Sequence, residues 1–451
     1  MVDQKWSALP VPHAITVPDR VPKERYFDPD FYSLEAEMLW PRVWQMACRL
    51  EEVPQVADFV EYENLDQSVV VVRTSEAEVQ AFQNACRHRG VKVVQGRGTL
   101  HSGFTCPFHG WCYGLDGKNT FVSQKRTFSE HNLESGDIDL VPVRCEVWGG
   151  CVWINLDQGA PPLRTYLGPA ATILDAWKME SLHPEWWYAC RIPANWKLAQ
   201  EAFVEQYHVL ETHPQLRIPG RFPPRGDQPF DPKAFVDGEL QYLHTMSDGM
   251  GGMVHADDVR VAEGLRDIEL PGDYEAASGA WNDALNRAVT DWHREAGHDV
   301  PDINELERQG FNEPMAYCFP HYIVLPMYSS ASAYRFRPLG PEETLMEIWS
   351  LSRTPNPDGQ RPTPPEPWEP GDDRWPPIPI QDFSNLQRQQ EGLHARGFRY
   401  MRLSQQAEGH ISNYQRVLDG FLAGLSYDKL LPALSKINVH PLEMPVLDFA
   451  F

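Results

Sequence analysis

The chain has 451 residues, 42% of them hydrophobic and 23% charged, which is the composition of a globular protein with room for two or three domains. Its formal net charge of −23 argues against binding to the phosphates of a nucleic acid. The N-terminus lacks the pattern of a secretory signal, and no run approaches the ~18 apolar residues of a membrane span, so we expect a soluble, cytoplasmic protein.

The first part of the chain predicts an N-terminal arm and a β-rich domain. Residues 1–40 contain scattered prolines and one short amphipathic stretch, and we interpret them as an arm that packs on the larger, C-terminal domain. Apolar runs at 69–72, 79–82 and 147–155 predict strands, the last of them interrupted by Gly149–Gly150. We therefore expect a small antiparallel domain over residues 41–157 that carries its functional groups on loops.

Residues 158–451 predict a larger domain that mixes helices and strands. The stretch 217–275 is rich in Gly, Pro and Asp and is interpreted as a long insertion or lid. Ten of the 26 residues from 354 to 379 are Pro, so we expect no regular structure there. Helices are predicted at 198–210, 383–393 and 408–422, and two strands joined by a turn at 338–341 are predicted within 328–352.

Four residues of the β-rich region have the spacing of a metal site: Cys86-x-His88, and then Cys106-x-x-His109. Each pair places one thiolate and one imidazole on a tight loop, and two such loops can hold a [2Fe–2S] cluster, with both thiolates on one iron and both imidazoles on the other. The chain has eight cysteines, but a disulfide framework is not expected in a cytoplasmic protein. A structural zinc site is the alternative, although zinc sites usually pair Cys with Cys and His with His.

The segments 82–90 and 106–113 resemble the two signature loops of the alpha subunits of Rieske non-haem iron oxygenases, and 40–44 is similar to the sequence that precedes the Rieske domain in that family. The resemblance extends, more weakly, to the C-terminus. It implies an α+β fold: a small antiparallel β Rieske domain and a catalytic domain over 158–451, whose antiparallel sheet is flanked by helices in a helix-grip, START-like arrangement. It also implies a [2Fe–2S] cluster on the four residues named above.

A second group of polar residues lies in the predicted helix 198–210 and just beyond it. Glu205 and His208 are three residues apart and would project from one helical face. His213 would be turned away from His208 by about 140° on a regular helix, so the helix must loosen before Pro214 if both imidazoles are to meet one ion. Two His and one carboxylate on one face of an iron leave positions free for O₂ and substrate, and the carboxylate has to come from elsewhere in the chain.

The resemblance implies that the third ligand of a mononuclear Fe(II) is Asp382, beside His208 and His213. It implies that Glu205 is not a ligand but a bridge between a Rieske His of one subunit and an iron-binding His of the next. Most ring-hydroxylating members have Asp at this position, and some branches, including oxygenases of quaternary ammonium compounds, have Glu. The alternatives are ordinary helix and loop histidines, a solvated Glu205, and an Asp382 that only caps a helix.

The resemblance further implies an oxygenase reaction. Electrons from NAD(P)H would reach the cluster through a partner reductase, with or without a ferredoxin, and would pass from His109 through Glu205 to His208 across a subunit boundary. Such a route requires a head-to-tail ring, which is a homotrimer in this family. No Gly-x-Gly-x-x-Gly fingerprint follows a predicted strand, so a separate reductase is expected. Whether a beta subunit accompanies the chain is not predicted by the sequence.

The substrate is expected to be an apolar aromatic or alicyclic compound that is hydroxylated by mono- or dioxygenation. Hydroxylation or oxidative dealkylation of a quaternary ammonium compound is the alternative. A Rieske electron carrier and a zinc-stabilised interaction protein are the readings outside this class. His321 is interpreted as a buried, hydrogen-bonded histidine. Candidate pocket walls are Phe203, Met246, Met250, Met253, Phe319 and Met327.

Overall fold

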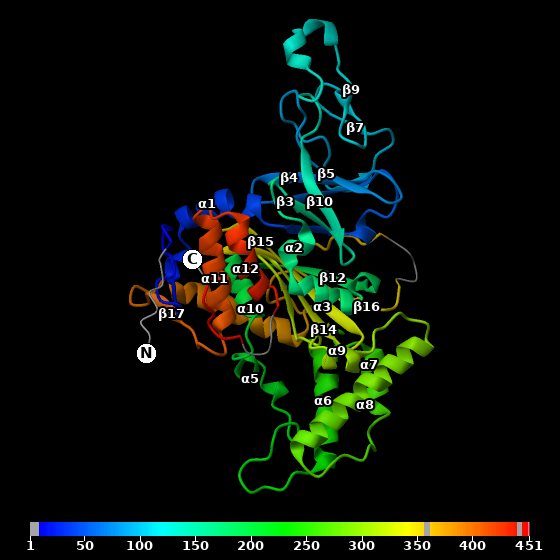
Figure 1. Ribbon diagram of the computed structural model, residues 1–451, viewed down its shortest axis with the longest axis vertical. Helices are drawn as coiled ribbons and strands as arrows, with labels where there is room; N and C mark the ends of the chain where they lie inside the picture. The colour runs from blue at the N-terminus through cyan, green and yellow to red at the C-terminus, as the bar shows by residue number, and fades with distance from the viewer. Residues whose placement is uncertain (1–8, 356–360, 440–443, 450) are drawn as a thin grey trace. The chain divides into compact units, whose positions relative to one another are not determined.

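The computed structural model describes residues 9–355, 361–439, 444–449 and 451. The chain forms two compact units (Figure 1): residues 34–166 together with 360–363, and residues 1–33, 167–359 and 364–451. We call the first the cluster unit and the second the catalytic unit. No helix among the described residues is long and apolar enough to cross a membrane. The expected domain boundaries at residues 40 and 157 stay predictions.

The cluster unit is built on a seven-stranded antiparallel sheet with the strand order β2-β11-β10-β5-β4-β3-β6. A small three-stranded sheet, β7-β8-β9, accompanies it. The strands are β2 Gln45–Arg49, β3 Asp58–Asn64, β4 Gln67–Arg73, β5 Val79–Gln83, β6 Arg97–Thr99, β7 Phe104–Thr105, β8 Cys112–Tyr113, β9 Asn119–Phe121, β10 Pro142–Trp148 and β11 Cys151–Asn155.

The valine run on β4 explains how this sheet is packed. Val69 and Val71 lie in one hydrophobic core, whereas Val70 and Val72 lie in another on the opposite face. Successive side chains of a strand point to opposite faces, so a continuous apolar run marks a strand buried on both sides. The predicted strands at 69–72 and 79–82 are thereby confirmed. Gly149 and Gly150, at φ +62° and +72°, form the turn between β10 and β11, as expected of a hairpin.

The catalytic unit contains a five-stranded antiparallel sheet with the order β12-β16-β15-β14-β13, and a two-stranded pairing of β1 with β17. Helix α4 packs on β15 and β16, α3 packs on β13, and α10 packs on β12. The α+β class predicted from the sequence is therefore confirmed. The strands are β1 Arg20–Pro22, β12 His183–Ile192, β13 Ala316–Cys318, β14 Tyr322–Met327, β15 Ser330–Gly340, β16 Glu343–Ser352 and β17 Tyr400–Arg402.

The longest α-helices, α6, α8 and α10, all lie after residue 231. Their bounds are α1 Pro29–Met38, α2 Leu163–Leu167, α3 Pro169–Ala176, α4 Trp196–Glu201, α5 Val209–Thr212, α6 Pro232–Gly249, α7 Ala256–Glu263, α8 Tyr274–Glu295, α9 Ile303–Arg308, α10 Pro377–Leu393, α11 Gly409–Leu422 and α12 Tyr427–Ile437. Two of the three helices predicted in this region, at 383–393 and 408–422, are confirmed, and the first of them begins six residues earlier than expected.

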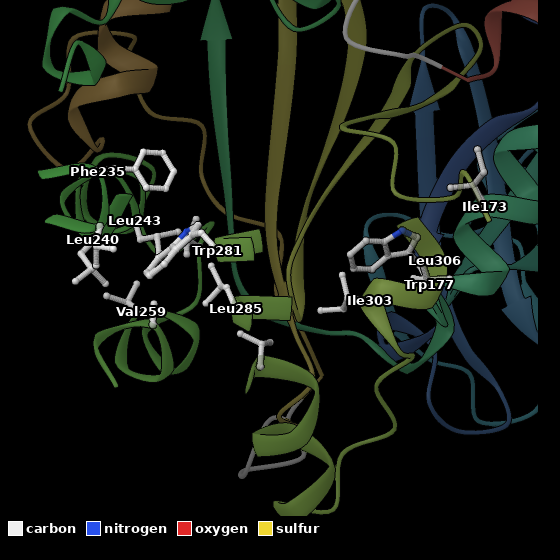
Figure 2. Packing of buried hydrophobic residues seen from close by; sticks show 14 residues of the cluster. Ile173, Trp177, Phe235, Leu240, Leu243, Val259, Trp281, Leu285, Ile303 and Leu306 are labelled. Carbon is white, nitrogen blue, oxygen red and sulfur yellow. The ribbon is translucent and has the colours of Figure 1, made fainter. Parts of the chain in front are cut away.

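The stretch 217–275, interpreted as a long insertion or lid, contains helices α6 and α7 and the first residues of α8. Helices α6 and α7 occupy most of residues 232–263, and α8 follows (Figure 1). These helices share a core with Trp177 and with α9, and Figure 2 shows Trp281 among the side chains of α6, α7 and α8. The Asp residues that suggested a loop are helix caps: Asp231 accepts hydrogen bonds from the N–H groups of Lys233 and Ala234.

Candidate metal centres

The four residues with the spacing of a metal site, Cys86, His88, Cys106 and His109, lie on two loops with the same backbone geometry. In the first loop, the N–H of Cys86 donates to the carbonyl of Val91 at 2.8 Å, and the N–H of Gly90 donates to the carbonyl of Cys86 at 2.9 Å. In the second, Cys106 and Trp111, and likewise Gly110 and Cys106, repeat the pattern at 2.8 and 3.0 Å. Gly90 and Gly110 both have positive φ, +78° and +70°, which is why each loop needs glycine four residues after its Cys.

These loops bring the two thiols and two imidazoles together. Cys86 and Cys106 are 3% and 2% exposed and belong to the same hydrophobic core. The rings of His88 and His109 lie 4.6 Å apart between centroids. A thiol–imidazole set of this composition fits a [2Fe–2S] cluster in which each iron takes one kind of ligand.

His88 supplies the most direct sign that something belongs between the loops. Its Nδ1 atom is buried and makes no hydrogen bond in the part of the chain that the structure describes. Burial, together with the charges of His109 and Arg89, lowers the pKa of His88, so the imidazole is neutral and keeps a lone pair for a metal. The ring is held in place by Trp111, which stacks on it at 5.1 Å and 6°.

Tyr113 is a part of this site that the sequence reasoning did not single out. Its hydroxyl accepts the N–H of Arg87 at 3.0 Å, so its proton is free to be donated to Sγ of Cys86, 3.2 Å away. Burial and the contact with Cys86 raise the pKa of Tyr113 far above its ordinary value, which keeps the phenol protonated as a donor. Hydrogen bonds to cluster sulfurs tune the reduction potential of such centres. The sequence signal was its position seven residues after Cys106.

Glu205 and His208 do not lie on a helix, so the helix predicted at 198–210 is wrong. Helix α4 ends at Glu201 and α5 begins at Val209, and Glu205 and His208 lie in the irregular segment between them. The carboxylate of Glu205 accepts the backbone N–H of His208 at 3.0 Å and contacts its Nδ1 at 2.5 Å. The helical-face argument for these two residues therefore fails, although they are still neighbours.

Asp382 meets both histidines. Its Oδ1 lies 3.7 Å from Nε2 of His208 and 3.1 Å from Nε2 of His213. One donor atom from each of the three residues lies within 4.8 Å of the others, and this is the single group of that kind found among the described residues. Asp382 lies in the interior of α10, whose N-cap is Pro376, so the alternative that it only caps a helix is wrong.

The Nδ1 atoms of both histidines contact hydrogen-bond acceptors. Nδ1 of His208 contacts Glu205, and Nδ1 of His213 contacts Oε1 of Gln381 at 2.7 Å. Gln381 is fixed in turn by Nε2 of Gln215, which donates to the same oxygen at 2.9 Å. Each imidazole thus carries its proton on Nδ1 and directs the Nε2 lone pair toward Asp382, as a histidine ligand of a metal requires. Gln381 was not singled out by the sequence reasoning.

The carboxylates around the two histidines favour a positive charge at this place, which a bound metal ion would supply. Burial lowers the pKa of His208 and of His213, but the contacts with Glu205 and Asp382 outweigh burial, and the net shift of both pKa values is upward. The two imidazoles lie beside one carboxylate, and the Nδ1 atom of each contacts a hydrogen-bond acceptor. Such a 2-His-1-carboxylate group fits Fe(II) and leaves other coordination positions free.

A cavity of 140 Å³ adjoins this group. Glu205, His208 and Asp382 line it on one side, and Glu201 and Glu408 also face it. None of the six expected wall residues lines this cavity. Phe203 instead packs on Tyr334 with ring centroids 4.6 Å apart, Phe319 stacks on Phe421, Met253 is buried, and Met246 and Met327 pack against the helical core of Figure 2.

His321 is the buried, hydrogen-bonded histidine that was expected. It is 0% exposed, and its Nδ1 pairs with the carbonyl of Phe336 at 3.1 Å. Burial, together with the charge of Arg335, lowers the pKa of His321 to about 3. It is therefore a neutral structural residue of the sheet.

Sequence comparison finds two family profiles on the chain. The profile of the Rieske [2Fe–2S] domain matches residues 43–133, and that of the ring hydroxylating alpha subunit (catalytic domain) matches residues 179–424. The first covers all four residues of the cluster loops. The second covers Glu205, His208, His213 and Asp382.

Curated relatives include both mono- and dioxygenases. The chain is 31% identical over 345 residues to the biphenyl dioxygenase subunit alpha of Metapseudomonas furukawaii, which covers 72% of this chain and 69% of the relative. It is 32% identical over 196 residues to the carnitine monooxygenase oxygenase subunit of Escherichia coli (strain K12), covering 43% of this chain and 52% of the relative. The chain thus matches about half the length of the latter relative.

Solved structures share the fold. A naphthalene 1,2-dioxygenase bound to phenanthrene superposes with a TM-score of 0.63 at 20% identity, over 92% of this chain and 95% of that one. A quaternary ammonium Rieske monooxygenase superposes with a TM-score of 0.59 at 16% identity, over 90% and 96%.

Proposed function

We propose that this chain, which belongs to the family of ring hydroxylating alpha subunits, is the oxygenase component of a multicomponent enzyme that uses O₂ and electrons from NAD(P)H to hydroxylate a small organic molecule. The chain carries the Rieske [2Fe–2S] domain and the mononuclear-iron catalytic domain of that family. The observation that most supports the proposal is the convergence of His208, His213 and Asp382. An electron carrier or a zinc-stabilised interaction protein would have no use for such a group.

In this proposal each set of residues has a defined task. The cluster supplies one electron at a time, and the mononuclear iron supplies a site where O₂ is reduced beside substrate. Cys86, Cys106, His88 and His109 hold the first group, and Tyr113 donates a hydrogen bond to a cluster thiolate. His208, His213 and Asp382 hold the second, and Gln381 orients His213.

Glu205 is proposed to accept a second imidazole N–H in addition to that of His208. Its Oε1 contacts Nδ1 of His208, and its Oε2 accepts a backbone N–H. His109 of the partner subunit is the proposed second imidazole, because His109 is exposed at the cluster loops. A head-to-tail homotrimer would bring the two together, since one carboxylate can bridge two imidazoles.

The electron donor is proposed to dock on the cluster loops through an acidic surface. Residues 86–127 contain seven Lys and Arg and one acidic residue, whereas the chain as a whole carries −23. Among them Arg89, Lys118, Lys125 and Arg126 are exposed. A basic surface around the cluster steers an acidic partner to the position from which an electron has the shortest path.

Two substrate classes are proposed, in order. Apolar aromatic or alicyclic compounds come first, because a relative that matches 72% of this chain is a biphenyl dioxygenase subunit. Quaternary ammonium compounds come second, because relatives include carnitine and glycine betaine monooxygenase subunits.

The experiment that tests the function is metal analysis followed by turnover. Anaerobically purified protein should contain about three irons and about two acid-labile sulfides per chain. With a reductase and NADH, O₂ uptake should depend on an added substrate from one of the two classes, and a hydroxylated product should appear. Zinc without sulfide would refute the proposal, and two irons with two sulfides that no added Fe²⁺ raises to three would reduce the chain to an electron carrier.

A further inference from the structure

Glu201 is a buried carboxyl group beside the mononuclear site to which the mechanism above gives no task. It is the last residue of α4 and is 5% exposed. One of its oxygens, Oε1, accepts hydrogen bonds from the hydroxyl of Tyr26 at 2.8 Å, from Nε2 of Gln415 at 2.8 Å, and from the hydroxyl of Tyr414. These donors come from distant parts of the chain, so the carboxyl is held rigidly.

The other oxygen, Oε2, is left for the cavity. The three hydrogen bonds named above all end on Oε1, and Glu201 lines the cavity beside the mononuclear site, so Oε2 is the oxygen that can meet water there. The water it meets is that of the 140 Å³ cavity, which Glu201 lines together with Glu205, His208 and Asp382. A carboxyl oxygen thus faces the same small space as two of the iron ligands.

Titratable groups from four parts of the chain surround Glu201. Lys197 acts on it from its own helix, Tyr26 from the N-terminal segment, Tyr317 from β13, and Tyr414 from α11, and Arg25 in turn acts on Tyr26. Burial raises the pKa of Glu201, and the hydrogen bonds and Lys197 lower it in part, so that it comes to about 7. A carboxyl of this kind exchanges its proton with water near neutral pH.

We infer that Glu201 is the proton-relay residue of the site: its carboxylic acid, held at Oε1 by three donors, supplies the protons consumed in O₂ reduction through water in the cavity. The inference rests on the proposed function, in which one O₂, two electrons and two protons are consumed for each hydroxylated product. In each transfer the O–H bond of Glu201 breaks and an O–H bond forms on cavity water. The carboxylate that remains is stabilised by Tyr26, Tyr414 and Gln415, and is protonated again from solvent.

The first test requires no turnover. Infrared titration of the purified protein should show the C=O band of a carboxylic acid that disappears with a midpoint near pH 7. The band should be missing in Glu201→Gln and unchanged in Glu408→Gln, which removes a second carboxyl from the same cavity. A wild-type protein without such a band, or a band that survives in Glu201→Gln, would overturn the inference.

The second test is the pH profile of the reconstituted enzyme. Because the acid form donates, the wild-type kcat should fall as pH rises through about 7. Glu201→Gln should lose about a hundredfold in kcat, the low end of the range for general acid catalysis, with KM and iron content unchanged. Glu201→Asp should recover part of the rate and of the pH dependence.

Tyr414→Phe gives a version of the test that keeps the carboxyl. Removing this donor should raise the pKa of Glu201 and move the loss of kcat to higher pH, because the hydrogen bond lowers that pKa. The relay would be refuted if kcat of Tyr414→Phe fell over the same pH range as kcat of the wild type. An unchanged kcat in Glu201→Gln would refute it as well. Failure of the proposed function looks different, because the wild type itself would then lack iron or O₂ uptake while the infrared test still decides the protonation of Glu201.

Discussion

Gln381 offers a sharp test of the mononuclear centre, because it contacts a ligand without being one. Its Oε1 holds Nδ1 of His213 at 2.7 Å and is itself fixed by Gln215. Gln381→Leu removes the acceptor and leaves the ring free to rotate or to change tautomer. Loss of such a partner typically lowers metal affinity by about 10- to 100-fold, which corresponds to about 1.4–2.7 kcal/mol.

The assay is an anaerobic Fe²⁺ titration of protein from which the mononuclear iron has been removed. Gln387→Leu is the matched control, since it makes the same change at an exposed position of the same helix, where the side chain contacts only Glu391. Gln381→Glu keeps an acceptor and should bind Fe²⁺ at least as tightly as wild type. Equal dissociation constants for Gln381→Leu and Gln387→Leu would refute the role assigned to Gln381.

Three further outcomes are expected. Cys106→Ala should lose the acid-labile sulfide and two irons while the remaining iron still binds, as metal and sulfide analysis would detect. Reduction of the cluster by its donor should slow as salt is added, and Lys125→Glu together with Arg126→Glu should slow it at low salt, as stopped-flow absorbance would measure. Burial alone would raise the pKa of Glu347, but Arg335 and Arg337 outweigh burial and lower that pKa from 4.5 to about 2, so the charged form adds about 3 kcal/mol of stability. That stability is present above pH 4.5 and is lost as pH falls through about 2, and Glu347→Gln should remove it at pH 7 in a urea unfolding experiment.

The cluster loops could be predicted because everything that forms them is local. The Cys and the His of each pair lie on one loop, and the glycine that permits the turn follows four residues after the Cys. The strands could be predicted because the apolar runs of β4 and β5 are a property of neighbouring residues. Local patterns of this kind do not depend on where the rest of the chain lies.

The helix predicted at 198–210 does not form because contacts with distant parts of the chain outweigh the helical propensity of this stretch. The residues of this stretch have helical spacing, yet α4 stops at Glu201, whose carboxyl group accepts hydrogen bonds from Tyr26 and Tyr414, 175 and 213 residues away. The next carboxylate, Glu205, then accepts the backbone N–H of His208, which a continuing helix would have used internally. The same distance explains why Gln381, 168 residues from His213, was not singled out.

The division of the chain into units bears on the order in which the protein can form during synthesis. The chain leaves the catalytic unit after residue 33 and returns to it at residue 167, so the cluster unit is an insertion, completed by the short segment 360–363. Strand β1 has its partner in β17, with Arg20 opposite Arg402, and Tyr26 has its partners in α11. The N-terminal segment therefore leaves the ribosome well before the strand and the helix with which it pairs. We expect the cluster unit to gain protection from hydrogen exchange early and the N-terminal segment to gain it late, when the chain closes on itself.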